Sequence, residues 1–260
     1  MSRRFVISDP HGHLDDLTRV LRSRDLVDDD GAWAGGTDRL FVLGDFFDRG
    51  PDGVGVVDAL MRWQREADAT GGHVDALIGN HEALALGMYR FGPSAGAADS
   101  RRESSFASSW VRNGGQAGDQ DRLTDAHVTW LTGLPSILVD DDLLLLHSDT
   151  REYLVWGDDV DAINTAVGGA LSGRDAEAAW HCWTRLTDRY AFLGSDGLAA
   201  ARDLLARLGG ERIVHGHSII ADLTGGQPVQ TAGPWAYADD LVLAIDGGRY
   251  AGGPLLLVEL

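Results

Sequence analysis

The sequence has no lysine, a single cysteine and no long apolar run. The absence of lysine excludes Schiff-base chemistry on a lysine and the P-loop, whose lysine binds phosphate. The lone Cys182 excludes an internal disulfide and any metal site built from several thiolates. The densest apolar patch, Leu143 to Leu146, falls far short of the roughly 18 residues that a membrane span needs. Because no signal-peptide pattern follows Met1, we expect a cytoplasmic protein that does not bind membranes.

Positive charge is also scarce. The 260 residues include 22 basic and 40 acidic side chains, which gives a formal net charge of −18. This charge disfavours binding to nucleic acid or to an anionic membrane surface. Apolar residues make up 44% of the chain, which is enough to fill a sizeable core. We expect one domain over residues 1–260, with a helical side insertion around residues 156–197.

Short apolar runs alternate with helical patterns near the start of the chain. Seven runs have the length and composition of buried strands. They are Phe5 to Ile7, Leu40 to Leu43, Val74 to Ile78, Leu143 to Leu146, Arg212 to Val214, Leu241 to Ile245 and Leu255 to Val258. After the first run, Leu14, Leu17 and Leu21 share one helical face. The alternation predicts parallel βαβ units, which bind ligands at the carboxyl ends of their strands.

Polar clusters follow five of these runs. They are Asp9-Pro10-His11, Gly44 to Gly50, Gly79-Asn80-His81-Glu82, His147-Ser148 and His215-Gly216-His217. One such cluster alone is usually a helix cap or a turn, but five at successive strand ends indicate a common site. Carboxylate, amide and imidazole donors suit manganese, iron or zinc better than calcium or magnesium.

The order of these clusters resembles the calcineurin-like metallophosphoesterases, in the phosphoprotein phosphatase branch, and especially the compact bacterial and phage serine/threonine phosphatases. Gly-Asp-x-x-Asp-Arg-Gly at residues 44–50 and Gly-Asn-His-Glu at residues 79–82 carry the resemblance most specifically. Ala244 to Gly248 resembles the closing strand and turn of the family. The resemblance implies an α/β fold, a four-layer α-β-β-α sandwich of two mixed sheets flanked by helices.

The resemblance also implies roles for single residues. The implied ligands of two divalent metal ions are Asp9, His11, Asp45, Asn80, His147 and His217, with Asp45 between the ions. His81 would be the acid, with Asp48 behind it, and Arg49 would bind phosphate. For a second phosphate-binding arginine we choose Arg185, in Trp183-Thr184-Arg185.

Two departures from the family pattern are visible. Pro10 lies inside the Asp-x-His motif, where it should hold Asp9 in an extended conformation. Ser148 and Asp149 follow His147 where small residues are more usual. Neither departure removes an implied ligand.

The implied site matches the chemistry of phosphoester hydrolysis. Two dications held by two carboxylates keep positive charge, which with Arg49 would bind a phosphate dianion despite the net charge of −18. A metal lowers the pKa of bound water from about 15.7 to near 7, so we expect in-line attack by metal-bound hydroxide. His81 would protonate the leaving alkoxide, and Asp48 would favour the charged imidazole. We therefore expect a phosphomonoesterase acting on phosphoserine or phosphothreonine in proteins, or on a small phosphoester, with manganese as the metal and iron or zinc as alternatives.

Two other functions stay open. A hydrolase of dinucleoside polyphosphates, such as diadenosine tetraphosphate, uses nearly the same motifs. A metal-stabilised binding protein without catalysis would not need Asp48, Arg49 and His81. His215 is an alternative metal-facing residue beside His217, whereas Glu82, His13 and Cys182 are expected to be structural.

Overall fold

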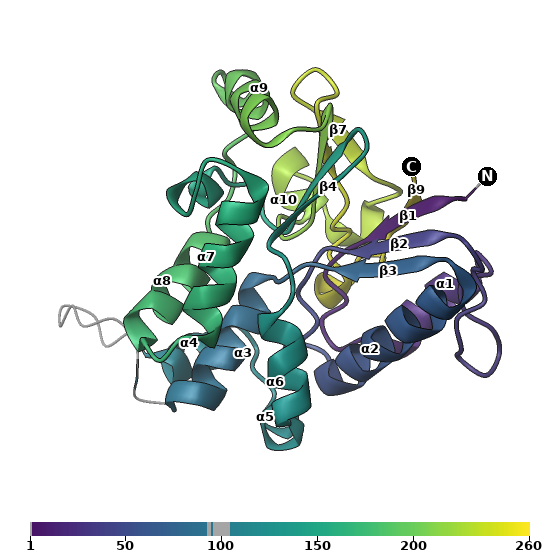
Figure 1. The fold of residues 1–260 in the computed structure, drawn as a ribbon. Helices are drawn as coiled ribbons and strands as arrows, with labels where there is room; N and C mark the ends of the chain where they lie inside the picture. The colour runs from purple at the N-terminus through teal and green to yellow at the C-terminus, as the bar shows by residue number, and fades with distance from the viewer. Residues whose placement is uncertain (1, 93–94, 96–104) are drawn as a thin grey trace.

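The computed structural model describes residues 2–92, 95 and 105–260, which include two mixed β-sheets (Figure 1). The first sheet has the order β3 (His73–Ala76), β2 (Arg39–Val42), β1 (Arg4–Ile7) and β9 (Leu257–Glu259). The second has the order β4 (Ile137–Asp140), β5 (Leu143–Leu146), β6 (Arg212–His215), β8 (Val242–Ala244) and β7 (Trp235–Tyr237). Strands β1, β2 and β3 are parallel, as are β5, β6 and β8, whereas β9, β4 and β7 run antiparallel to their neighbours.

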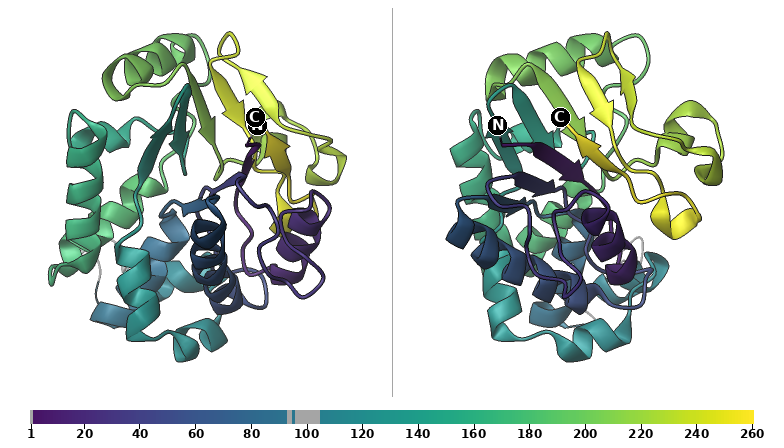
Figure 2. Two further views of the ribbon diagram at one scale, coloured as in Figure 1. Left: turned by 45° about the vertical axis from the view of Figure 1, so that its right-hand side comes forward. Right: turned by 90° about the vertical axis from the view of Figure 1, so that its right-hand side faces the viewer.

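Helices lie outside both sheets, as the predicted fold class requires. The helices after the first three strands are α1 (Leu14–Arg22), α2 (Gly53–Thr70) and α3 (Asn80–Phe91). Later in the chain come α4 (Phe106–Arg112), α5 (Ala117–Arg122), α6 (Asp125–Thr132), α7 (Val160–Ser172), α8 (Ala176–Leu186), α9 (Gly197–Leu208) and α10 (Ile220–Thr224). Short 3-10 helices are η1 (Glu152–Val155), η2 (Pro228–Gln230) and η3 (Arg249–Ala251). Figure 2 shows α1 and α2 on the outer side of the first sheet and α9 beyond the second.

Strands β1, β2, β5, β6 and β8 are almost entirely buried on both faces, which explains their continuous apolar runs. Val6 and Phe41 face a cluster between the two sheets, together with Leu145 and Val214 of the second sheet. Residues on the opposite face of β1, such as Phe5, join the larger core under the helices. Each fully buried side chain of this size contributes about 1.5–3 kcal/mol to folding. The two sheets are therefore held face to face by their own alternate side chains.

A helical layer flanks the strand ends. Helix α8 packs against α3 and α7, so two parts of the chain far apart in sequence form one wall. A small apolar cluster of Leu84, Phe106 and Trp180 fixes this contact. Helices α7 and α8 occupy most of residues 156–186 within the predicted helical stretch. The stretch from Gly92 to Ser105 is rich in small and polar residues, which predicts a loop, and it lies largely outside the described residues.

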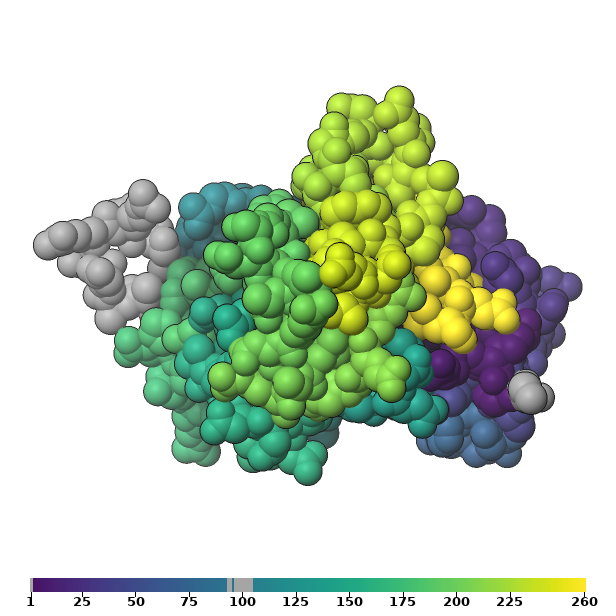
Figure 3. All heavy atoms as spheres, turned by 90° about the horizontal axis from the view of Figure 1, so that it is seen from above, coloured from purple at the N-terminus to yellow at the C-terminus, as the bar shows by residue number. Residues whose placement is uncertain are grey.

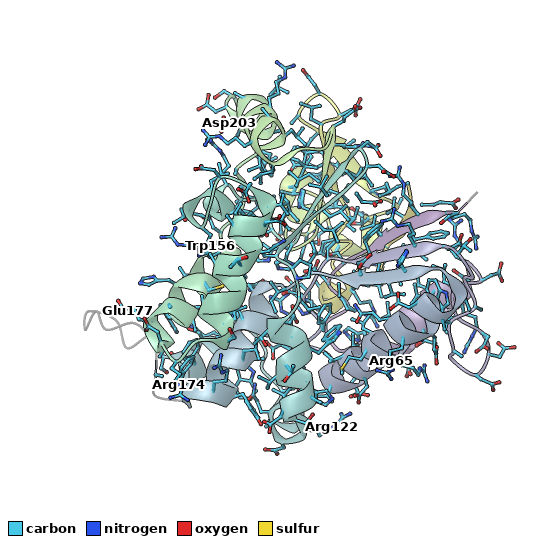
Figure 4. The ribbon with its side chains drawn as sticks, in the orientation of Figure 1. Arg65, Arg122, Trp156, Arg174, Glu177 and Asp203 are labelled. Carbon is cyan, nitrogen blue, oxygen red and sulfur yellow. The ribbon has the colours of Figure 1, made fainter. Side chains whose placement is uncertain are left out.

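Charge is carried on the outside. Figure 4 labels Arg65 on α2, Arg122 on α5, and Glu177 on α8, which lie at the periphery of the molecule and are exposed. The face seen in Figure 3 is formed mainly by the second half of the chain, coloured green to yellow. Within the described part of the chain, no helix combines the length and apolar character needed to cross a membrane.

Candidate metal centre and active site

Five strand ends meet where the two sheets come together. The turns after β1, β2 and β3 carry Asp9, His11, Asp45 and Asn80, and those after β5 and β6 carry His147 and His217. All six side chains are buried, and none is more than 7% exposed. The predicted convergence of the polar clusters is therefore present in the fold.

One group of candidate ligands gathers around the first side of Asp45. Its Oδ2 lies 3.7 Å from Nε2 of His11 and 3.8 Å from Nε2 of His81. Oδ1 of Asp9 lies 4.0 Å from the same nitrogen of His11. His11, Asp45 and His81 together have the spacing needed to hold a metal ion.

A second group uses the other side of Asp45. Its Oδ1 lies 3.3 Å from Nε2 of His147, and with His217 these residues again have metal-site spacing. The Asn80 carboxamide lies between them, with its oxygen 2.9 Å from Nε2 of His147. Asp45 thus belongs to both groups, as a bridging carboxylate must.

Backbone carbonyls fix the orientation of three imidazoles. The contacts are His11 Nδ1 to Phe47 O at 2.9 Å, His147 Nδ1 to Leu43 O at 2.7 Å, and His217 Nε2 to Thr187 O at 3.1 Å. A carbonyl oxygen only accepts hydrogen bonds, so each of these nitrogens carries the proton. The other nitrogen of each ring then presents a lone pair to the centre, which is the usual arrangement of metal-binding histidines.

The contents of the centre fit divalent cations. The atom of the Asn80 carboxamide that faces the centre lies 3.0 Å from Nδ1 of His217 and 3.2 and 3.3 Å from the two oxygens of Asp45. As an oxygen it meets only acceptors, and a cation would satisfy all of them at once. Oδ2 of Asp246 is likewise buried with no hydrogen-bond partner among the described residues. Burial, with Asp9 nearby, raises the pKa of both Asp45 and Asp246 well above the usual range. A buried excess of carboxylates and lone pairs is what a metal ion would stabilise.

The backbone of the site is strained. Left-handed φ values occur at Asp9 (53°), His11 (41°), Asp45 (58°), Asp48 (66°), Arg49 (65°) and His217 (62°). Such conformations cost on the order of 1–3 kcal/mol each in non-glycine residues and concentrate at functional sites. The prediction that Pro10 holds Asp9 extended is wrong. The chain turns there because the N–H of Asp9 donates to Gly44 O at 3.2 Å and that of His11 to Asp45 O at 2.9 Å, which ties the turns after β1 and β2 together.

Glu82 fixes the turn after β2 that carries Asp45. Its carboxylate accepts from the backbone N–H groups of Asp45 at 2.8 Å, Phe46 at 2.6 Å and Gly79 at 2.9 Å. This agrees with a structural role, since the side chain does not face the metal groups. The carboxylate positions Asp45 through its backbone.

His81 and Asp48 form a buried pair beside the first group. Nδ1 of His81 lies 2.6 Å from Oδ2 of Asp48, whose other oxygen accepts from Nε1 of Trp110 at 3.1 Å. Burial raises the pKa of Asp48 to about 7. Burial, then the charge of Arg49, lowers the pKa of His81 well below its usual value. In the protein without metal or substrate, burial and Arg49 thus oppose the charged imidazole that Asp48 is expected to favour.

The two predicted arginines lie in different places. Nη1 of Arg49 lies 3.2 Å from Nε2 of His11, and its guanidinium lies 3.7 Å from the ring centre of Tyr250. Arg185 instead pairs with Glu152 in an open hollow of about 240 Å³ and is not brought to the candidate ligands. The motif Trp183-Thr184-Arg185 lies on α8, and Arg185 in its last turn pairs with Glu152 of η1 and not with a candidate ligand.

Sequence reasoning missed Arg189. This half-buried arginine lies in the turn after α8, and its charge lowers the pKa of both His81 and His217. The signal was in Thr187-Asp188-Arg189, a polar stretch that we included in a helical segment. Because the helix ends at Leu186, the following residues are free to turn toward the centre.

Other candidates have structural partners. His215 is buried with Nε2 against the hydroxyl of Tyr237 at 2.9 Å, and it belongs to neither metal group. Cys182 is buried on α8, and burial raises the pKa of its thiol to about 12. Neither residue takes part in the centre.

Comparison with known proteins identifies relatives. The family model for calcineurin-like phosphoesterases matches residues 2–220. Shewanella-like protein phosphatase 2 of Arabidopsis thaliana is 31% identical over 90 residues, which cover 34% of this chain and 23% of the relative. Shewanella-like protein phosphatase 1 of Plasmodium berghei is 36% identical over 85 residues, which cover 33% of this chain and 24% of the relative. The matches span less than a quarter of the length of either relative.

Solved structures share the fold. The cold-active protein-tyrosine phosphatase of a psychrophilic Shewanella species aligns with a TM-score of 0.71 at 20% identity, covering 100% of this chain and 75% of that one. A protein serine/threonine phosphatase from Saccharomyces cerevisiae aligns with a TM-score of 0.56 at 15% identity, covering 94% of this chain and 67% of that one. At these identities the likeness establishes the α/β architecture of two mixed sheets and outer helices.

Proposed function

Because the chain belongs to the calcineurin-like phosphoesterase family, we propose that it is a metal-dependent phosphatase that hydrolyses phosphomonoesters. The observation that carries this proposal is the position of Asp45, shared by two buried His/Asp groups of metal-site spacing. The His81–Asp48 pair and Arg49 lie directly against those groups. No simpler structural role accounts for so many buried, strained polar residues at one place.

We assign the metal ligands as the family resemblance implies. Two divalent ions, with manganese as our first choice and iron or zinc as alternatives, would be held by Asp9, His11, Asp45, Asn80, His147 and His217. When bound, such ions lower the pKa of water and polarise the phosphoryl group. The carbonyl contacts behind the three histidines would fix the ring orientation before a metal arrives.

Arg49 would bind the phosphate. Its guanidinium reaches the edge of the first group and lies over the Tyr250 ring, a cation–π contact that limits its motion. A planar guanidinium can donate two hydrogen bonds to a phosphate at once. Arg189, whose charge acts on His81 and His217, replaces Arg185 as our second phosphate-binding arginine.

His81 would deliver the proton to the leaving group. Asp48 accepts from Nδ1, which directs Nε2 toward the centre, where it lies 3.8 Å from Asp45. Its lowered pKa makes the protonated ring a strong acid, and the negative charge of a bound phosphate favours protonation. The ring can therefore gain its proton with the substrate and lose it to the alkoxide.

We propose phosphoserine and phosphothreonine proteins as substrates. The matched relatives are named protein phosphatases, which supports a protein substrate. A structural neighbour is a protein-tyrosine phosphatase, and another is a putative diadenosine tetraphosphatase, with a TM-score of 0.54 at 18% identity over 100% of this chain and 93% of that one. A panel of phosphoserine, phosphothreonine and phosphotyrosine peptides with diadenosine tetraphosphate separates these substrates. We expect kcat/KM to be highest for phosphoserine or phosphothreonine; a preference for either of the other substrates would reject this assignment.

Asp45→Asn tests the bridging role. At saturating manganese we expect kcat for an aryl phosphate to fall by at least about 100-fold, because a neutral amide cannot bridge two cations. Asp38→Asn is the matched control. Asp38 is also buried, and its carboxylate accepts from the N–H of Arg3 at 2.8 Å, but it precedes β2 at the opposite end of the strand. Near-normal activity of Asp45→Asn would refute the bridge.

A further inference from the structure

Asp149 is a buried carboxylate for which the proposed function has no use. It lies two residues after His147 and has no exposed surface. It belongs to neither metal group, and it occupies a position where the sequence departs from the family pattern. A buried charge without partners would be strongly destabilising, so its contacts reveal what it does.

The carboxylate joins two segments that are distant in sequence. One oxygen accepts from the hydroxyl of Ser218, the residue after His217. The other accepts from the N–H of Tyr190 at 2.9 Å, and the Asp149 carbonyl accepts from the N–H of Ala191 at 2.9 Å. One residue thus ties the turn after α8 to the turn after β6.

The turn over residues 187–191 lies against the candidate centre. The carbonyl of Thr187 accepts from Nε2 of His217 at 3.1 Å, which leaves Nδ1 without a proton and with its lone pair free to bind a metal ion. Arg189 lies two residues further on in the same turn, is half-buried, and has its guanidinium 5.9 Å from the ring centre of Tyr190. The turn has a second link to the Asp149 segment, from the Thr150 hydroxyl to Asp188 at 2.6 Å.

We propose that Asp149 is a positioning residue for phosphate binding: it fixes the turn over residues 187–191 so that Arg189 faces the metal-bound phosphate. This inference rests on the proposed phosphatase function and deepens it. Without the link, the turn would sample more orientations, and phosphate would have to order it on binding. Asp149 acts through Arg189 and not by contact with substrate.

The Asn and Ala variants distinguish positioning from charge. In Asp149→Asn, the carboxamide oxygen can still accept from Tyr190 and its NH₂ can donate to the Ser218 hydroxyl, so the link survives. In Asp149→Ala both bonds are lost. A role of the negative charge itself predicts equal effects of the two substitutions, whereas positioning predicts that Asn retains function.

Calorimetric binding of inorganic phosphate to the manganese-loaded protein measures the effect. We expect the Kd to rise about tenfold in Asp149→Ala and to stay within about threefold of wild type in Asp149→Asn. Ser218→Ala removes only one of the two side-chain hydrogen bonds of Asp149 and should give an intermediate Kd. Asp38→Asn is the control for loss of a distant buried carboxylate and should leave the Kd unchanged. Equal Kd values for wild type and Asp149→Ala would overturn the proposal.

A double-mutant cycle tests the route through Arg189. If Asp149 acts by placing Arg189, then Asp149→Ala should change the phosphate Kd by less than about twofold in a chain that already carries Arg189→Ala. A tenfold effect that persists without Arg189 would mean that Asp149 acts by another route. General loss of structure also predicts persistence, so the cycle separates positioning from a merely structural role.

Amide hydrogen exchange tests the positioning role of Asp149 independently of phosphatase activity. Exchange within residues 187–191 should be faster in Asp149→Ala than in wild type, and unchanged in Asp38→Asn. If the wild type binds phosphate but hydrolyses no phosphoester, the proposed function is wrong. The phosphate Kd and the amide exchange rates would still test whether Asp149 positions the turn. Unchanged exchange in Asp149→Ala would overturn the positioning role even in an active phosphatase. If Asp149→Ala does not fold, Ser218→Ala and Asp149→Asn decide by the same Kd and exchange criteria.

Discussion

At the scale of single residues, His81 is the group whose role depends most on its surroundings. Burial and Arg49 lower its pKa, while Asp48 fixes its ring through Nδ1. A general acid matters most when the leaving group is a poor one. The side chain should therefore be far more important for some substrates than for others.

His81→Asn should lower kcat for an alkyl phosphate at least about tenfold more than for p-nitrophenyl phosphate, since nitrophenolate leaves without a proton. Steady-state rates with both substrates at saturating manganese measure the difference. Equal losses for the two substrates would contradict an acid role and leave His81 as a group that orders the centre. In that case His81, which belongs to the first metal group, would order the centre as a member of that group.

Glu82 offers a second test at this scale. Both of its oxygens accept from backbone N–H groups, at Asp45, Phe46 and Gly79. In Glu82→Gln an amide NH₂ would face one of those donors, so we expect a loss of about 2–4 kcal/mol in the free energy of unfolding. Chemical denaturation measures it. A loss below about 0.5 kcal/mol would show that the carboxylate does not hold the Asp45 turn.

At the scale of elements, the tight approach of neighbouring turns builds the site. A side chain at Gly50 would collide with the backbone carbonyl of His11, so the turns after β1 and β2 can meet only if residue 50 is glycine. Gly50→Ala should weaken manganese binding and lower the free energy of unfolding by about 1–3 kcal/mol. Gly118 on α5 is the matched control, because a methyl group there meets nothing within 4 Å. Gly118→Ala should raise stability by about 0.5–1 kcal/mol, since alanine favours the helix. Equal effects of the two substitutions would contradict the close approach.

The elements also show where sequence reasoning succeeds. Each of the seven predicted runs overlaps a strand, and most of these strands are continuously apolar because they are buried on both faces. The edge strands β4 and β7 were missed. Three-residue β7, Trp235–Tyr237, is half-exposed and pairs on one side only, so neither length nor period distinguishes it from a loop.

In the candidate site, too, some residues could be predicted from the sequence and others could not. Strand-end positions could be predicted because parallel strands end at one edge, which brings Asp9, Asp45 and Asn80 together whatever the loops do. Arg185 and Arg189 could not be told apart, because the choice depends on where α8 ends. A single arginine is a weak signal, and the sequence does not show that α8 ends at Leu186, between the two.

At the scale of the whole molecule, a net charge of −18 surrounds a centre that collects buried carboxylates. Without metal, burial raises the pKa of Asp45 and Asp246 above the unfolded value, so the folded state holds protons more tightly than the unfolded chain. These two carboxyls should make the free energy of unfolding of the metal-free protein fall as pH rises through their folded pKa values. Burial lowers the pKa of His11, His81 and His217, which removes stability as pH falls below about 6.5, so the fall due to the carboxyls should be seen above neutral pH. Carboxylate ligands must be ionised to bind metal, so manganese should reverse this trend.

Thermal unfolding with chelator and with manganese checks this prediction. We expect the Tm of the metal-free protein to fall as pH rises from about 7 to about 9, and manganese to raise Tm by about 5 °C or more at about pH 8 but by less at about pH 5. The gain should shrink at the lower pH, where protons compete for the ligands. A gain from manganese that is larger at about pH 5 would contradict a carboxylate-rich metal centre.

We propose that two metal ions share Asp45 as a ligand and that both are required for phosphoester hydrolysis. Titration of chelator-treated protein with manganese, followed by p-nitrophenyl phosphate hydrolysis, tests this most directly. We predict no turnover without metal and a rate that reaches its plateau at about two manganese ions per chain. Hydrolysis that survives the chelator, a plateau at one ion, or no turnover at any manganese concentration would contradict it.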